Sequence, residues 1–251
     1  MSSFEINYAR FYDYFHANKN YLNEAKSILN LLPSNYFEGK RRTIFDFGCG
    51  TGLHLDTFNS LGFEIEGYDK SEAMIRFASE RNKNGKFSTN LADFDSQVGL
   101  SLSLFDVASY QTTTKALTEM IEIMSSRLQS GGFLVLDTWQ AEGILLDPPS
   151  ESSRTVQVGQ EVFRRVVRPI REVESELGAS SKLFELEVTI EDLQGCKIVS
   201  SEIHKIRPWS RLEVRTILRN LNLTEVSLFN PKTFGLSQPS DWRIGIVAAK
   251  P

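Results

Sequence analysis

The sequence predicts an α/β fold: a mostly parallel sheet with helices on both faces, interrupted by an antiparallel β insertion after the fifth strand. Strand and helix patterns alternate from residue 43 to residue 144, the order that is typical of parallel sheets. A glycine-rich turn joins the first strand to the helix after it. Between residues 145 and 208, β-branched and aromatic residues alternate, which indicates antiparallel strands joined by turns.

Length and composition describe an ordinary globular protein. The 251 residues are 41% apolar and 24% charged, enough to bury a full core without disulfides. The net charge of −4 argues against nucleic acid as a partner, no apolar run approaches the ~20 residues of a membrane span, and the N-terminus lacks a signal-peptide pattern. We expect a cytoplasmic protein that binds neither nucleic acid nor a membrane.

The cysteines and histidines give no sign of a metal site. Cys49 and Cys196 are far apart, and we interpret both as free thiols in a reducing compartment. His16, His54 and His204 do not have the spacing of metal ligands, so no metal is expected.

The first 55 residues predict two helices followed by a strand, a glycine-rich turn and the start of a third helix. Two short helices are expected around residues 9–16 and 22–32. The segment IFDFGCGTGLHL, residues 44–55, then predicts a buried strand, a turn and a helix. Alternate glycines let the backbone pass close under a ligand, to which the following helix offers its free N–H groups. The third glycine comes one residue earlier than in the dinucleotide fingerprint G-x-G-x-x-G.

Two acids accompany this turn. Asp46 precedes the first glycine by two residues, and an acid there suits a cationic amine better than a pyrophosphate. The segment EIEGYDKSEAM, residues 64–74, predicts the second strand with Asp69 at its C-terminal end, about 20 residues past the turn, where Rossmann-type sites bind ribose hydroxyls. Alternatively, Asp69 or Ser71 caps the next helix, and the two roles are compatible.

The rest of the chain predicts three more strands of the first part of the sheet, two helices and two closing strands. We expect a short strand near residues 86–89, a fourth strand over residues 103–111 with Asp106 near its start, and a fifth strand over residues 131–139. A helix between the last two places Leu117, Ile121, Met124 and Leu128 on one face. Beyond the insertion, SRLEVRTILRNLN predicts a helix that opens with a capping box, and LTEVSLF and DWRIGIVAAKP predict two closing strands.

These motifs resemble the class I S-adenosylmethionine-dependent methyltransferases. The β-rich insertion, the tyrosine-rich segment NYARFYDYF and CGTGLHL make the chain most similar to the dTDP-amino-sugar N,N-dimethyltransferases of macrolide biosynthesis. The resemblance covers most of the chain. It implies a seven-stranded Rossmann-like sheet, S-adenosyl-L-methionine as cofactor, and methylation of the amine of a small molecule or nucleotide-linked amino sugar by in-line displacement.

The resemblance also implies a division of the chain into three parts. Residues 1–42 would form helices that cap the active site. Residues 43–144 and 209–251 would form the cofactor-binding domain. Residues 145–208 would form an inserted subdomain for substrate binding or oligomerisation, and the oligomeric state stays open between a monomer and a homodimer.

Cofactor contacts are carried over residue by residue. Asp46 would face the methionine end of the cofactor, with Tyr21 near it, and Asp69 would accept from both ribose hydroxyls. Met74 would lie near the ribose or adenine, unless it is simply a core residue. The other expected cofactor contacts are Gly48, Cys49, Gly50, Gly52, His54, Lys70 and Ser109.

Adenine recognition has two possible registers. Asn90 would stand where the family has an acid, with Leu91 as the backbone donor. In a shifted register, Asp93 would be the adenine ligand instead.

Two residues are candidates for catalysis. Tyr12 matches a family tyrosine over the active site, although Tyr12 and Tyr21 could also serve only to pack their helices. The family often has a histidine after the fourth strand, where this chain has none. His204, in the inserted strands, aligns with another family histidine, and its alternative role is structural hydrogen bonding.

Candidate substrate contacts are Tyr110, Gln111, Trp139 and Arg165. Arginine suits the two phosphates of a nucleotide-linked sugar. Since alternate strand positions face opposite sides, at most one of Arg164 and Arg165 reaches inward.

Other functions remain open at this point. A small-molecule O- or C-methyltransferase would need a different base in place of the missing histidine. A chain that binds the cofactor without turnover would act as a scaffold. An NAD-dependent oxidoreductase is disfavoured by the early third glycine and the lack of a Tyr-x-x-x-Lys motif.

Overall fold

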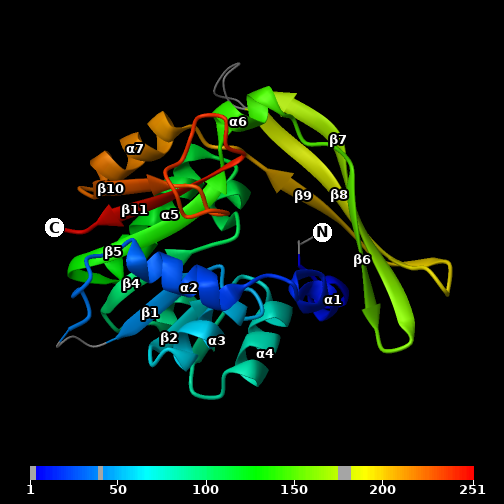
Figure 1. Cartoon of the computed structure of the whole chain (residues 1–251), viewed down its shortest axis with the longest axis horizontal. Helices are drawn as coiled ribbons and strands as arrows, with labels where there is room; N and C mark the ends of the chain where they lie inside the picture. The colour runs from blue at the N-terminus through cyan, green and yellow to red at the C-terminus, as the bar shows by residue number, and fades with distance from the viewer. Residues whose placement is uncertain (1–3, 39–41, 175–181) are drawn as a thin grey trace.

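The computed structural model describes residues 4–38, 42–174 and 182–251 (Figure 1). Its larger sheet has seven strands in the order β10-β11-β5-β4-β1-β2-β3. Strands β1 to β5 are parallel to one another, and β11 is antiparallel to both β5 and β10. The strands are β1 (Thr43–Phe47), β2 (Glu64–Tyr68), β3 (Lys86–Ser88), β4 (Val98–Ser103), β5 (Leu128–Trp139), β10 (Thr224–Phe229) and β11 (Arg243–Ala249). This topology confirms the predicted α/β fold.

Helices cover both faces of the seven-stranded sheet. Helices α5 and α7 pack on one face, and α2 and α3 pack on the other. The helices are α1 (Ile6–His16), α2 (Tyr21–Asn30), α3 (Leu53–Ser60), α4 (Glu72–Arg81), α5 (Thr114–Ser126), α6 (Ala141–Leu146) and α7 (Arg211–Asn220), with short 3₁₀ turns η1 (Leu91–Asp93) and η2 (Val107–Tyr110). None of the helices in the described ranges is long and apolar enough to cross a membrane.

The insertion after β5 forms a second, antiparallel sheet in the order β6-β7-β8-β9. Its strands are β6 (Ser152–Val158), β7 (Glu161–Glu174), β8 (Lys182–Asp192) and β9 (Lys197–Ile206). Helix α1 lies between this sheet and α4 (Figure 1). Phe11 and Phe15 of α1 share one apolar cluster with Met74 of α4 and Phe163 of β7. The N-terminal helix therefore connects the two sheets.

Local sequence explains how the two helices after β2 and β9 begin. Ser71 accepts a hydrogen bond from the backbone N–H of Met74 and caps α4. Ser210 and Glu213 form the predicted capping box of α7.

The prediction for the fourth strand was wrong. The strand is Val98–Ser103, six residues that are all buried, and residues 104–111 form a loop and η2. Phe105 and Asp106 have φ values of 69° and 68°, which no strand can accommodate. The real strand, VGLSLS, is hidden in the sequence by its glycine and serines, of which Ser103 donates a hydrogen bond to the carbonyl of Phe47.

The structure also corrects the predicted positions of Asp106 and Leu128. Asp106 does not start a strand; it is the N-cap of η2. Leu128 is buried as predicted, but it is the first residue of β5 and does not belong to α5.

A buried ion pair joins β2 of the larger sheet to the end of α5. The Glu66 carboxylate of β2 lies 2.9 Å from the Arg127 guanidinium at the end of α5, and the two side chains are 9% and 10% exposed. Arg127 also donates to the carbonyl of Phe94, and Ser96 donates to Glu66 at 2.6 Å. Loss of one partner would leave the other charge buried without compensation.

We expect Glu66→Ala to lower the free energy of unfolding by ~3 kcal/mol, because it strands the Arg127 charge. Glu80→Ala is the control, since Glu80 pairs with Arg76 at the surface with side chains that are 55% and 70% exposed. Urea denaturation of both variants measures the difference, and equal unfolding midpoints would contradict a stabilising role for the buried pair.

Candidate active site

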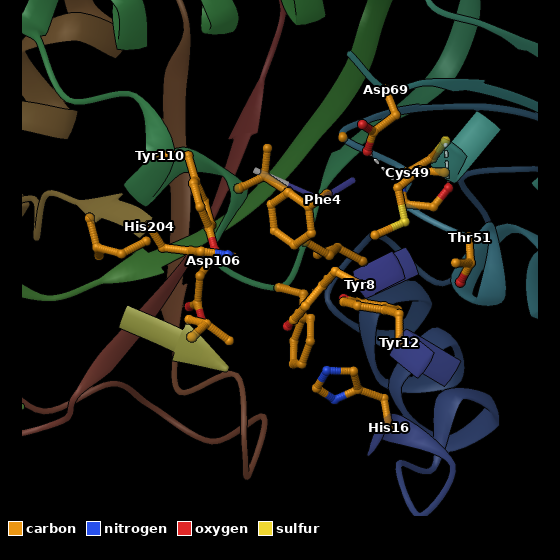
Figure 2. A pocket seen from close by; sticks show the side chains of 18 of the residues that line it. Phe4, Tyr8, Tyr12, His16, Cys49, Thr51, Asp69, Asp106, Tyr110 and His204 are labelled. Carbon is orange, nitrogen blue, oxygen red and sulfur yellow. Dashed lines mark hydrogen bonds between the residues drawn. The ribbon is translucent and has the colours of Figure 1, made fainter. Parts of the chain in front are cut away.

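A cavity of about 480 Å³ lies at the carboxyl ends of the parallel strands, between the glycine-rich turn, α1 and the second sheet (Figure 2). Its walls combine the turn after β1, the end of β2, the loop before η2, and inward-facing residues of β7 and β9. Parallel α/β sheets bind ligands at this edge.

The turn after β1 presents its backbone to the cavity. Gly48 has φ +82°, and a Cβ there would lie 2.5 Å from the Val107 side chain, so only glycine fits. Gly50 has φ +54°, and a Cβ there would meet no heavy atom within 4 Å, because open space lies in front of it. Gly52 is the N-cap of α3 and packs against Ala78 of α4, outside the cavity lining.

Asp69 connects the turn to the end of β2. Its Oδ2 accepts from the N–H of Gly50 at 3.0 Å and its Oδ1 from the N–H of Ser71 at 2.9 Å. Burial raises the pKa of the Asp69 carboxyl, while these two hydrogen bonds lower it. A carboxylate has about four acceptor positions, so Asp69 keeps capacity for ligand hydroxyls. Lys70, Met74 and the buried free thiol of Cys49 line the same wall.

Asp46 is a buried acid with one carboxylate oxygen that lacks a hydrogen-bond partner in the described part of the chain. The residue is 2% exposed, and the oxygen in question is Oδ1. Burial, followed by the nearby charges of Asp69 and Asp137, raises its pKa to about 8. Asp46 lies behind the cavity surface. A cationic group at this end of the cavity would stabilise its ionised form.

Helix α1 supplies an aromatic wall that faces the turn (Figure 2). The ring of Tyr12 lies 4.5 Å from the ring of His16 and 6.4 Å from that of Phe4. Burial, above all, raises the pKa of Tyr12 well above its usual range, so its hydroxyl stays neutral. None of the hydrogen bonds among the described residues involves that hydroxyl. It is therefore available to a ligand.

A second group of polar residues lies beside the turn. Lys19 forms an ion pair with Glu24 at 3.0 Å, and its Nζ lies 3.9 Å from the centre of the Phe105 ring. Glu24 also contacts Nε2 of His54 at 2.9 Å. The ring of Tyr21 lies 4.9 Å from the His54 ring, and both of these predicted residues line the cavity.

The opposite wall contains a chain of three hydrogen-bonded side chains. The Tyr110 hydroxyl lies 2.7 Å from Nδ1 of His204, and Nε2 of His204 lies 3.0 Å from the Glu202 carboxylate. Glu202 also accepts from the backbone N–H groups of Phe4 at 2.7 Å and Glu5 at 2.9 Å. The N-terminal segment is thereby fastened to β9.

The remaining substrate candidates also lie on the cavity. Gln111 and Trp139 line it, and so does Arg165, whose Nε donates to the Tyr8 hydroxyl at 3.0 Å. Arg164 turns away and pairs with Glu191 at 2.7 Å. Only one of the two neighbouring arginines points inward, as the strand alternation requires.

Besides Asp46 and Gly52, four more predicted cofactor residues do not line the cavity. Asn90 caps η1 through Ala92, Leu91 is half-buried beneath it, and Asp93 is exposed and accepts from Ser88. Ser109 is fully buried, and its Oγ contacts Thr138 and the N–H of Trp139. Ser109 was misplaced because the fourth strand ends at Ser103, eight residues before the predicted end, so this serine faces β5 from η2.

Sequence reasoning missed several cavity residues, which are Phe4, Tyr8, His16, Phe105, Asp106, Trp242 and Arg243. Arg243 pairs with Asp106 at 2.5 Å and lies opposite Trp139 in the ladder of β11 and β5. Glu202 was missed although the spacing Glu-x-His on a strand places both side chains on one face. Within the described ranges, no group of three or more His, Cys, Asp or Glu residues could hold a metal ion.

Comparisons with known proteins agree with this geometry. A family described as a methyltransferase domain matches residues 8–227. The dTDP-3-amino-3,4,6-trideoxy-alpha-D-glucopyranose N,N-dimethyltransferase of Streptomyces venezuelae is 28% identical over 141 residues, 54% of this chain and 59% of that protein. The dTDP-4-amino-2,3,4,6-tetradeoxy-D-glucose N,N-dimethyltransferase of Saccharopolyspora spinosa is 26% identical over 143 residues, 55% of this chain and 57% of that protein. The match thus spans less than two thirds of either relative's length.

The crystal structure of DesVI from Streptomyces venezuelae shares the fold over the whole chain. Its TM-score is 0.75 at 23% identity, and the match covers 99% of this chain and 100% of DesVI. Since the family match spans most of the sequence, the chain belongs to the methyltransferase domain family.

Proposed function

We propose that the protein transfers a methyl group from S-adenosyl-L-methionine to the amine of a nucleotide-linked amino sugar. The observation that carries the proposal is the glycine-rich turn fastened to Asp69 at one end of a cavity that is closed by aromatic residues at the other. The names of the two relatives that match this chain favour an amino sugar as acceptor.

The residues present fit the cofactor. Open space in front of Gly50 admits a ligand close to the backbone, and the free acceptor capacity of Asp69 suits ribose hydroxyls. The orphaned Oδ1 of Asp46 suits the positive end of an amino acid. When bound, the cofactor supplies an electrophilic methyl group on a sulfonium. The chain's own contribution is to orient the acceptor, exclude water and handle the acceptor's proton.

An amine acceptor suits this cavity better than an oxygen acceptor. The tyrosine hydroxyls in it stay neutral because burial raises their pKa values. Burial also lowers the pKa of His16 to about 3, so this imidazole is a weak base. An alcohol would need a stronger base than these groups. An ammonium group is far more acidic than an alcohol, and its neutral amine is already a nucleophile.

The direct test incubates the protein with methyl-labelled cofactor and three acceptor sets. These are the dTDP-linked 3-amino and 4-amino sugars named for the relatives, the matching hydroxy sugars, and a pool of simple amines. We expect label on the sugar nitrogen, located by mass spectrometry. Transfer only to the hydroxy sugars would overturn N-methylation, and cofactor binding without any transfer would favour a scaffold.

We expect Asp69→Ala to raise the dissociation constant of S-adenosylhomocysteine at least tenfold. Two hydrogen bonds to a charged acceptor contribute about 1.5–3 kcal/mol each, and the turn also loses its anchor at Gly50. Asp56→Ala on the exposed side of α3 is the control and should bind like the parent. Calorimetry measures both, and an unchanged affinity in Asp69→Ala would remove Asp69 from the cofactor site.

We expect Tyr12→Phe to lower turnover about tenfold or more while leaving the affinity for S-adenosylhomocysteine nearly intact. The Tyr12 hydroxyl would orient the acceptor nitrogen, an interaction that belongs to the transition state rather than to cofactor binding. Tyr14→Phe, on the outer face of the same helix where Tyr14 is 47% exposed, is the matched control. If Tyr12→Phe turns over like the parent, Tyr12 serves only to pack α1.

A further inference from the structure

The hydrogen-bonded side chains of Tyr110, His204 and Glu202 form a directed path out of the cavity. Tyr110 lines the cavity, and its hydroxyl reaches Nδ1 of His204 at 2.7 Å. A carboxylate can only accept, so the 3.0 Å contact between Nε2 and Glu202 requires the proton of the neutral imidazole on Nε2. Nδ1 is then the acceptor, and the Tyr110 hydroxyl donates to it.

The far end of the path is a fixed negative charge. Burial opposes ionisation of Glu202, but hydrogen bonds from His204 and from the N–H groups of Phe4 and Glu5 outweigh it and lower the pKa of this carboxyl. His204 is 2% exposed and Glu202 4% exposed, so both are shielded from bulk water. The imidazole is therefore held between this carboxylate on one side and the Tyr110 hydroxyl on the other.

The rings around the path keep it dry. The Phe4 ring lies 5.4 Å from that of Tyr110 and 5.1 Å from that of His204, and Figure 2 shows it between these residues and the Asp69 side of the cavity. The other titratable or charged groups that act on this wall are Tyr8 of α1, Arg165 of β7 and Asp106 before η2. Arg165 is engaged by the Tyr8 hydroxyl and Asp106 by Arg243.

We infer that Tyr110, His204 and Glu202 form a proton relay that deprotonates the acceptor amine, with Tyr110 as the catalytic residue and Glu202 as a positioning residue. An N–H bond of the acceptor ammonium breaks and its proton passes to the Tyr110 oxygen. The hydroxyl proton of Tyr110 passes to Nδ1 of His204. The electron pair left on nitrogen becomes the nucleophile, and the imidazolium remains paired with Glu202. This inference rests on the proposed function.

The relay explains how a wall of neutral tyrosines can still remove a proton. Burial raises the pKa of Tyr110 well above its usual range, so no phenolate forms at neutral pH. The hydroxyl instead accepts one proton while it donates another, and the charge resides on His204. Glu202 performs two tasks, because the same carboxylate also holds the backbone of Phe4 and Glu5 over the cavity.

The test is the pH profile of kcat/KM with the dTDP-linked 3-amino sugar as acceptor. With the relay, the protonated acceptor is used, so the profile is flat below the pKa of its amine as long as Nδ1 of His204 carries no proton. Without the relay, only the neutral amine reacts and the rate rises with pH. We expect Tyr110→Phe to lose at least ten times more activity near pH ~6.5 than near pH ~8.5. Glu202→Gln should also lose more of its kcat/KM at the lower pH than at the higher pH.

Two controls separate the relay from packing. Tyr8→Phe removes the phenol hydroxyl that accepts from Arg165 on the same aromatic wall and leaves the hydrogen bonds of Tyr110, His204 and Glu202 in place, so it should keep the shape of the parent profile. Ser71→Ala removes the hydrogen bond from Ser71 to the carbonyl of Phe4 while Glu202 stays in place, so any loss there should be equal at both pH values. Equal losses at both pH values in Tyr110→Phe and Glu202→Gln would overturn the relay and leave the proposed function standing.

A second readout needs no acceptor. In ¹⁵N spectra of histidine-labelled protein, with His204 assigned from a His204→Gln variant, we expect the proton on Nε2 and a shift of the Nδ1 resonance in Tyr110→Phe. A proton on Nδ1, or an Nδ1 resonance unaffected by Tyr110→Phe, would overturn the relay. A parent that binds cofactor but methylates no amine would overturn the proposed function, and the relay with it.

Discussion

The Asp69 carboxylate is the contact on which the cavity depends. It receives one N–H from the glycine-rich turn after β1 and another from the start of α4, so two βα junctions of the sheet meet at one side chain. The turn itself has positive φ values that alternative residues would resist, and Gly48 is pressed against Val107 of η2. Without a carboxylate at position 69, the N–H groups of Gly48 and Cys49 would still bind the carbonyl of Tyr68 at the end of β2, but Gly50 would lose its partner. A ligand held by both elements then adds to an existing hydrogen-bond network and requires little reorganisation of the backbone.

The rest of the cavity is assembled from parts that are distant in sequence. Helix α1 packs on α4 with one side and on the second sheet with another, through apolar residues that include Phe11 and Phe163. Thr51 of the turn donates to Asp13 of α1 at 2.5 Å, and Asp13 also pairs with Arg81 of α4. At the other end, Glu202 of β9 receives the backbone N–H groups just before α1. The helix is therefore tied to the cofactor side and to the second sheet by different groups, and it can hold its tyrosines in place only when both attachments are made.

The glycine-rich turn after β1 and the acid after β2 could be predicted from the sequence because local rules determine them. A buried strand, a glycine turn and an acid at the end of the next strand are close in sequence, and each has a conformational reason to be there. The fold and the family followed from the same segment and are confirmed. The fourth strand was harder to predict, since VGLSLS is buried on both faces and lacks the strong alternation of an edge strand. Because of that error, Ser109 was expected at the cofactor, whereas its side chain packs against β5. The opposite wall, with Phe4, Glu202 and Arg243, is brought together only by tertiary packing, and no local pattern indicates that these residues meet.

The same separation allows the second sheet to supply an imidazole to a wall whose own loop has none. A loop histidine after the fourth strand is absent here, and two consecutive residues with positive φ, Phe105 and Asp106, occupy that loop instead. Their N–H groups are both held by the Asp137 carboxylate of β5, which keeps the loop close to the sheet and leaves Tyr110 at the cavity wall. An imidazole reaches the same wall from β9, an element of the other sheet, and contacts the tyrosine hydroxyl from behind. Chemistry that depends on a hydroxyl backed by an imidazole requires only that the two groups meet, so a residue missing from one loop can be replaced from a strand that packs against it.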